Sequence, residues 1–281
     1  MILSQPHTFN KIRWLFIALF FLVTVAGNFF YGKLIEDSIP ILIVLSLFIA
    51  VILHGKARYG IKNMLIFFIL TWLISHFFEA LSIQTGFPFG HYYYDKLAGP
   101  RLFQVPLIIM PAYFGMIYIS WMLSHILLRQ YSKKLQGAQV FFLPLIAAFI
   151  MVMWDLCIDP QASTIASLWV WPNGGAYFGV PLQNYFGWFL VVYSILQIFA
   201  LYIARNDLYD AQKLKLFSSK LFWQEIVALY AIQTLLQLLS PFTQTQYMEI
   251  YKPIALIAVF TMLFVTLLAF IIIENTEDAH V

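Results

Sequence analysis

Three carboxylates stand inside or at the ends of long apolar segments, where a charged side chain is unfavourable. Glu79 lies about one turn from the end of one apolar run, and Asp155 and Asp159 lie at the end of another. A charged carboxylate at the centre of a bilayer costs about 2.5–3.5 kcal/mol on insertion scales. Burial favours the neutral form of a carboxyl group, and a neutral acid in dry surroundings can protonate an apolar substrate. These three residues are therefore the predicted catalytic groups.

Two of these carboxylates also have a purely structural interpretation. Glu79 could hydrogen-bond His76, one turn earlier on the same predicted helix, and only lock the packing. Asp159 precedes Pro160, and this pair is typical of a helix N-cap and first turn, so a cap and a chemical role stay equally open. If the helix instead continues past Asp155, both aspartates lie on one face and tend to share a proton. Asp155 has no capping explanation, so a functional role is favoured there.

Glycines, prolines and aromatic residues gather in two segments, 79–101 and 154–188. The glycines permit tight turns, and non-helical backbone at membrane depth persists only where protein or a cavity buries it. The aromatic residues alone would be typical of an interfacial belt, but beside such loops they predict a cavity wall that can stabilise a cation. For Arg101 a structural salt bridge to a loop carboxylate is the favoured role. The predicted substrate-binding residues are His76, His91, Tyr92, Tyr94, Arg101, Trp171, Tyr177, Asn184 and Trp188.

The elements that must position these residues are apolar helices. The 281 residues are 62% hydrophobic and 10% charged, whereas soluble domains carry about 25% charged residues. We predict an all-α, polytopic integral membrane bundle of about eight transmembrane helices with re-entrant outer loops, forming a single domain over 1–281. Each run is near the length that spans a bilayer; the second is the shortest. The runs are Ile12–Tyr31, Ile39–Leu53, Met64–Leu81, Pro106–Leu128, Val140–Leu156, Tyr185–Ala204, Leu221–Leu239 and Pro253–Ile273.

The basic residues predict the orientation of the bundle. Lysine and arginine favour cytoplasmic connections, and with the N-terminus inside, twelve of the 16 fall on that side and four outside. We therefore expect a multi-pass protein of the cell membrane with both termini cytoplasmic. Both glycine-rich loops then fall on the outer side, where they can share one pocket. The outer set is Lys33, Lys96, Arg101 and Lys252. The cytoplasmic set is Lys11, Arg13, Lys56, Arg58, Lys62, Arg129, Lys133, Lys134, Arg205, Lys213, Lys215 and Lys220.

The sequence predicts no cofactor and no metal. The single cysteine, Cys157, excludes an intrachain disulfide and a cysteine-based zinc or iron–sulfur site. There is no phosphate-binding glycine loop, no aspartate-rich magnesium–diphosphate motif and no His-rich box. A metal would require His76, His91 and the three carboxylates to fold together. No basic cluster with interleaved aromatic residues indicates nucleic-acid binding.

The loop motifs resemble those of a known family. The resemblance covers about two thirds of the chain, from the third apolar run through the sixth, and it is to the CruF-type carotenoid 1′,2′-hydratases. It implies water addition to the terminal 1′,2′ double bond of an acyclic end group, as in lycopene, γ-carotene or a C50 carotenoid, giving a tertiary alcohol. It also implies a lipid-soluble carotenoid, water and membrane lipid as partners. Other enzymes of the carotenoid pathway are further candidate partners. The motifs are Glu79…Thr85-Gly-Phe-Pro-Phe-Gly90…Tyr92…Tyr94, Gly99-Pro100-Arg101…Val105-Pro106, Asp155…Asp159-Pro160, and Trp171…Gly174-Gly175…Tyr177-Phe-Gly-Val-Pro181…Asn184…Gly187-Trp188.

The residues themselves suggest a mechanism of acid-catalysed hydration, in which the roles of the individual carboxylates stay open. Either Glu79 or Asp155 supplies the proton, and the other, with or without Asp159, orients the attacking water. Two other functions remain open: a polyisoprenoid-modifying membrane enzyme of different chemistry, and a non-catalytic carotenoid-binding or lipid-translocating protein. A binding protein would need the cavity but not the carboxylates, so carboxylate-to-amide substitutions distinguish it from an enzyme.

Overall fold

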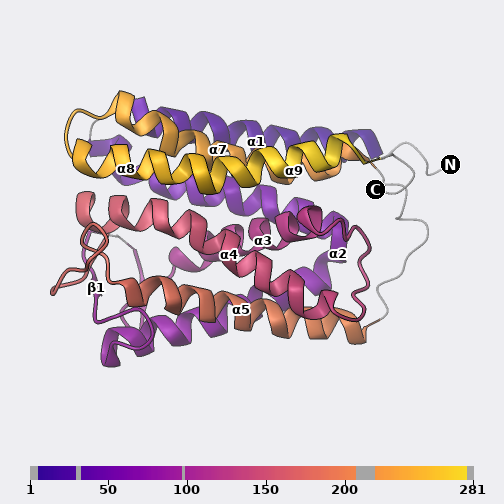
Figure 1. Cartoon of the computed structure of the whole chain (residues 1–281), viewed down its shortest axis with the longest axis horizontal. Coiled ribbons are helices and arrows are strands. Elements are labelled where there is room, and N and C mark those ends of the chain that lie inside the picture. Colours follow the sequence, from indigo (N-terminus) through magenta and orange to yellow (C-terminus); the bar gives the residue numbers. More distant parts are fainter. Residues whose placement is uncertain (1–5, 30–32, 97–98, 207–218, 277–281) are drawn as a thin grey trace.

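The computed structural model describes residues 6–29, 33–96, 99–206 and 219–276, and these form an almost entirely helical molecule (Figure 1). Two π-helical turns, η1 (Pro160–Ile165) and η2 (Val259–Leu263), extend α4 and join α8 to α9. The all-helical membrane class is thus confirmed. The helices are α1 (Pro6–Phe29), α2 (Lys33–Thr85), α3 (Ile109–Leu127), α4 (Gln139–Asp159), α5 (Leu182–Arg205), α7 (Lys220–Thr243), α8 (Met248–Ala258) and α9 (Phe264–Glu274).

Seven helices in the described ranges are long and apolar enough to cross a membrane. One of them, Ile39–Thr85, has 47 residues, although about 20 residues suffice to cross a bilayer. Gly60 interrupts this helix with φ 78° and ψ 163°, a backbone conformation that glycine adopts without a steric penalty. The halves on either side of Gly60 correspond to the second and third predicted spans, so this helix has the length for two crossings.

Helix α3 lies in the middle of the bundle, and nearly all of its residues are buried. Helices α1, α7, α8 and α9 pack together along one side of it (Figure 1). Helices α4 and α5 and the second half of α2 lie along the other side. The carboxylates predicted to be functional belong to this second group.

The second half of α2 shows how the sequence divides lipid-facing from interior positions. Leu73 and Phe77 are 64% and 60% exposed on the outside of the bundle, where lipid would cover them. Ser75, His76 and Glu79 are buried on the opposite face. Positions three and four apart share one helix face, so these polar side chains face the interior of the bundle.

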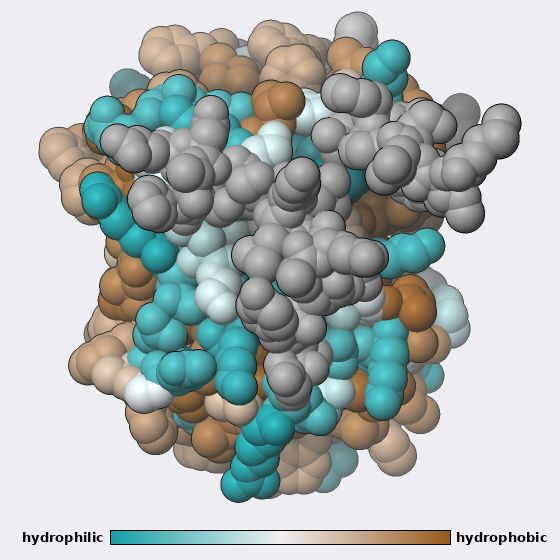
Figure 2. Space-filling view, turned by 90° about the vertical axis from the view of Figure 1, so that its right-hand side faces the viewer, coloured by the Kyte–Doolittle hydropathy of each residue, from teal (hydrophilic) through white to brown (hydrophobic). Residues whose placement is uncertain are grey.

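One end of the bundle gathers basic residues. Arg13 of α1 donates to both carboxylate oxygens of Glu225 on α7, with N···O distances of 2.6 and 3.1 Å. Arg58 donates to the carbonyl oxygens of Tyr131 and Ser132 at 3.3 and 3.2 Å. Figure 2 shows hydrophilic residues across this end of the molecule and hydrophobic ones around its rim. The predicted connection 205–220, with Lys213 and Lys215, lies mostly outside the described residues.

The opposite end carries the two glycine-rich loops, which pair with each other. Strand β1 (Tyr93–Tyr94) runs antiparallel to β4 (Trp169–Val170), with Tyr93 opposite Val170 and Tyr94 opposite Trp169. A second pair, β2 (Arg101–Leu102) with β3 (Val105–Pro106), forms a short hairpin before α3. Segments far apart in the sequence therefore meet over one end of the bundle, as predicted from their placement on a single side.

Candidate functional site

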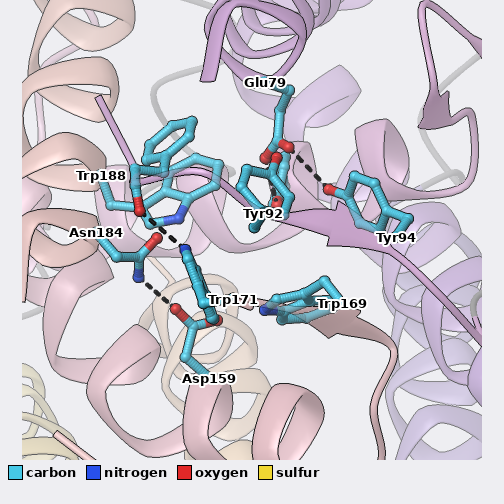
Figure 3. A pocket seen from close by; sticks show the side chains of 10 residues that line it. Glu79, Tyr92, Tyr94, Asp159, Trp169, Trp171, Asn184 and Trp188 are labelled. Atoms are coloured by element: carbon cyan, nitrogen blue, oxygen red, sulfur yellow. Dashed lines mark hydrogen bonds between the residues drawn. The ribbon is translucent and has the colours of Figure 1, made fainter. Parts of the chain in front are cut away.

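A cavity with an empty volume of about 220 Å³ lies where the paired loops meet α2, α3, α4 and α5. Its centre has room for roughly one water molecule. Glu79 and Asp159 point into it from opposite sides, and indole and phenol rings fill most of the remaining wall (Figure 3). The lining residues are Glu79, Phe89, Tyr92, Tyr94, Tyr113, Asp159, Trp169, Trp171, Asn184 and Trp188.

Two phenols hold the Glu79 carboxyl group. The Tyr94 hydroxyl donates to Oε2 at 2.9 Å, and the Tyr113 hydroxyl donates to Oε1 at 2.7 Å. Burial, and then the neighbouring Glu79, raise the pKa of the Tyr94 hydroxyl well above its ordinary value, so it keeps its proton and stays a donor. The expected partner His76 is wrong, because the bonding partners of Glu79 come from β1 and α3.

Asp155 and Asp159 share one amide donor. The Asn184 side-chain amide on α5 donates to Asp159 and, at 3.3 Å, to Asp155. Both aspartates are 3% exposed. The cap interpretation of Asp159 is wrong, because α4 continues through Pro160 into the π-helical turn η1 and the Asp159 side chain makes no capping bond. Both carboxyl groups therefore lie on one helix face, one turn apart.

A hydroxyl on α2 anchors the first loop over the cavity. Ser82 Oγ donates to the Gly90 carbonyl oxygen at 2.9 Å and accepts from the Phe89 N–H at 3.0 Å. Trp171 Nε1 of the second loop donates to the Phe89 carbonyl oxygen at 3.0 Å. Gly90 has φ +91°, and a Cβ there would come within 3.3 Å of the Trp171 ring, so glycine lets the indole approach the backbone. These contacts fix the aromatic wall.

The rings of the wall contact each other in two rows. Trp188 stacks on Phe89 with centroids 4.7 Å apart and meets the Tyr113 ring at 4.3 Å. Tyr92 lies between Trp171 and Tyr94, at centroid distances of 5.6 and 5.5 Å. The faces and edges of these rings bound the space between the two carboxyl groups, where a cation could be stabilised by about 0.5–2 kcal/mol per ring.

The structure brings together seven of the predicted site residues and leaves five outside the lining. Tyr92, Tyr94, Trp171, Asn184, Trp188, Glu79 and Asp159 line the cavity. Asp155 is linked to the cavity through Asn184, His76 is buried on α2, and His91 is exposed. Arg101 donates to the carbonyl oxygens of Tyr94 and Asp95, and Tyr177 donates to the carbonyl oxygen of Leu156.

This placement corrects one expectation. Asp159, and not Asp155, is the aspartate that faces Glu79 across the cavity. Tyr113 was not predicted as a site residue; it lies on α3, outside both loops, and donates to Glu79. Only the packing of α3 against α2 brings it there. Phe89 and Trp169 also line the cavity, and both belong to the two segments that are rich in aromatic residues.

The described residues that could ligate a metal do not cluster. Within the described ranges no three His, Cys, Asp or Glu side chains lie close enough together to hold an ion. His76 and His91 in particular do not converge with the three carboxylates. The polar groups of the cavity are instead arranged as two carboxyl sites on opposite walls.

Known proteins that are similar to this chain belong to carotenoid biosynthesis. The chain is similar to a bisanhydrobacterioruberin hydratase of Haloarcula japonica, with 31% identity over 119 residues. That stretch covers 42% of this chain and 38% of the relative, so the chain matches well under half of the relative's length. No solved structure matches it. The family model described as "carotenoid biosynthesis protein" matches residues 38–271, which include both loops and all three carboxylates. The chain therefore belongs to the carotenoid biosynthesis protein family.

Proposed function

We propose that this protein hydrates the 1′,2′ double bond at an acyclic end of a carotenoid, such as lycopene, γ-carotene or a C50 carotenoid. Its family membership supports a role in carotenoid biosynthesis, and the relative named a hydratase supports water addition. The observation that carries the proposal is the pair of carboxyl groups, Glu79 and Asp159, on opposite walls of one aromatic cavity. An alkene is a poor base, and its protonation requires a neutral acid held against it.

The aspartate pair is the better candidate for the acid. Asp155 and Asp159 lie one turn apart and share the Asn184 amide, and two close carboxyl groups disfavour holding two charges. The neutral member of the pair carries the proton. Asp159 then delivers it to C2′: the O–H bond breaks, the π electrons form the new C–H bond, and a tertiary cation remains at C1′. The aromatic faces around the cavity stabilise that cation.

Glu79 is the better candidate for the base. It accepts hydrogen bonds from Tyr94 and Tyr113, and such bonds favour the ionised form of a carboxyl group. Water attacks C1′ with a lone pair, and one of its protons passes to the Glu79 carboxylate. The product is a tertiary alcohol. Proton exchange with solvent restores both carboxyl groups, so the reaction adds one water and requires no oxidant or reductant.

The end group must displace part of the aromatic wall to reach these residues. The centre of the cavity has room for roughly one water molecule, which is less than an isopropylidene group occupies. The loops close the cavity through a two-residue strand pair and a few single hydrogen bonds. We propose that these loops part to admit the carotenoid end from the lipid and close again around it.

Product analysis tests the proposal directly. The protein is expressed in hosts that make lycopene, γ-carotene or a C50 carotene, and the pigments are separated and weighed by mass spectrometry. We expect a new pigment heavier by one water for each hydrated end, with a tertiary alcohol and an unchanged conjugated system. A pigment of lower mass would indicate a desaturase. A pigment of unchanged mass but altered absorption would indicate an isomerase, and unaltered pigment that co-purifies with the protein would indicate a binding protein.

A further inference from the structure

We infer that the Tyr92 hydroxyl holds the water that captures the cation, so that Tyr92 decides whether a protonated end group becomes an alcohol or returns to the alkene. This inference rests on the proposed hydration. Tyr92 lines the cavity and is 6% exposed. Its hydroxyl oxygen is buried, and no hydrogen-bond partner for it lies within the described ranges. Buried hydroxyl groups are nearly always hydrogen-bonded, to protein or to water.

The other two phenols of the cavity already have a partner. Tyr94 and Tyr113 both donate to Glu79. Tyr92 is therefore the phenol of the cavity whose hydroxyl can still donate and accept a hydrogen bond, because no described group bonds to it. The free space at the centre of the cavity matches one water molecule in size. A water there satisfies the Tyr92 hydroxyl and lies between the two walls that carry Glu79 and Asp159.

Packing keeps the Tyr92 hydroxyl in place. Its ring is fixed between Trp171, at 5.6 Å and 42°, and Tyr94, at 5.5 Å and 74°. Successive side chains of an extended segment point to opposite sides, and the next residue, Tyr93, is 47% exposed on the outer face. A phenol on a rigid ring can hold a water with one lone pair bonded and the other directed at C1′.

The chemistry gives this role a specific consequence. A tertiary cation without a positioned water loses one of the two hydrogens at C2′ to a neighbouring carboxylate, and the alkene returns. In D2O the added hydrogen is deuterium, so loss of the original hydrogen leaves deuterium at C2′ of the unhydrated carotenoid. Hydration and isotope exchange thus report separately on water capture and on protonation.

The test compares Tyr92→Phe with Tyr93→Phe in membranes supplied with the carotenoid in D2O, at matched protein levels. Tyr92→Phe keeps the ring and removes one oxygen, and Tyr93→Phe makes the same change on the outer face. For Tyr92→Phe we expect at least about a tenfold fall in alcohol, the usual size of losing a buried hydrogen-bond partner. We also expect deuterium at C2′ of the recovered carotenoid. Tyr93→Phe should match the unsubstituted protein.

Three results would overturn the inference. Tyr92→Phe could form alcohol as fast as Tyr93→Phe, which would show that its hydroxyl does not hold the water. Tyr92→Phe could lose hydration and deuterium exchange together, which would show a structural contribution to the whole site. If the unsubstituted protein itself gave neither alcohol nor exchange, the proposed hydration would be wrong, and the inference would fall with it.

Discussion

At the scale of single residues, Asn184 joins the two aspartates, and its replacement tests how they depend on each other. Asn184→Leu keeps the size of the side chain but removes the amide that donates to Asp155 and Asp159. Two buried carboxyl groups then lose the amide donor that they share, so we expect the free energy of unfolding in detergent to fall by about 1–3 kcal/mol. Hydration per folded protein should fall as well.

A double substitution is the control for this prediction. If Asn184 acts through the carboxyl group, Asn184→Leu should cost less stability when Asp159→Asn is already present, because the partner has changed. The measurement is thermal or denaturant unfolding of the single and double variants. Additive losses would show that Asn184 and Asp159 do not depend on each other, contrary to the geometry.

Residue types predicted which carboxylates lie in the cavity better than they predicted the hydrogen-bond partners of those carboxylates. Glu79 and Asp159 could be singled out because carboxylates in apolar runs are rare and expensive to place there. In the sequence, Asp155 was favoured over Asp159 because Pro160 suggested that Asp159 caps a helix. The structure removes that explanation, since α4 continues past Asp159 into a π-helical turn. Tyr113 could not be predicted. A single tyrosine in an apolar helix is ordinary, and its role comes from a contact between α3 and α2.

At the scale of elements, the pairing of β1 with β4 closes the cavity, and a reversible crosslink tests whether it must open. Tyr93 and Val170 are directly opposed, and opposed antiparallel residues have Cα atoms about 4.5–5.5 Å apart, within the range that a disulfide spans. We expect Tyr93→Cys with Val170→Cys to hydrate slowly when oxidised and normally when reduced. Cys157 is fully buried and should not compete.

The single-cysteine variants Tyr93→Cys and Val170→Cys are the matched controls, and oxidant should leave their hydration rates unchanged. The measurement is alcohol formed per unit of protein before and after a reductant is added. Equal rates in the oxidised and reduced double variant would mean that the carotenoid reaches the cavity without separation of these strands.

Element boundaries could be predicted where apolar length decides them. All eight predicted runs correspond to helices, since an apolar segment in a bilayer must satisfy its backbone hydrogen bonds internally. The join of the second and third runs into one helix bent at Gly60 was not predicted. Neither was the pairing of two-residue strands, because so short a pattern carries no periodicity and depends on contacts between distant segments.

At the scale of the whole molecule, the paired loops lie at the end opposite Arg13 and Arg58, and the distribution of basic residues in the sequence predicts the orientation. Twelve of the 16 lysines and arginines fall in sequence segments that we expect in the cytoplasm. Asn173→Cys, exposed in the second loop, should react with a membrane-impermeant maleimide in intact cells. Gln136→Cys, exposed in the connection between α3 and α4, should react only after the membrane is opened.

The opposite labelling pattern would place the loops in the cytoplasm and the basic end outside. The cavity would remain as described, since it depends on packing within the bundle. Its carotenoid would then approach from the inner leaflet, and the positive-inside interpretation of this chain would be wrong. Buried Cys157 is the internal control for background labelling, because the unsubstituted protein carries it alone.

We propose that Glu79 and Asp159, on facing walls of one cavity, carry the hydration of a carotenoid end. The most direct test measures alcohol formed per unit of membrane protein for Glu79→Gln and Asp159→Asn. Glu249→Gln serves as the control, since Glu249 is exposed in the first turn of α8. Each cavity variant keeps its size but loses a transferable proton or a base. We expect both to lose hydration by a factor of about 10²–10⁴, the usual contribution of general acid–base catalysis, and the control to keep it. Hydration at the control rate by both cavity variants would contradict the account.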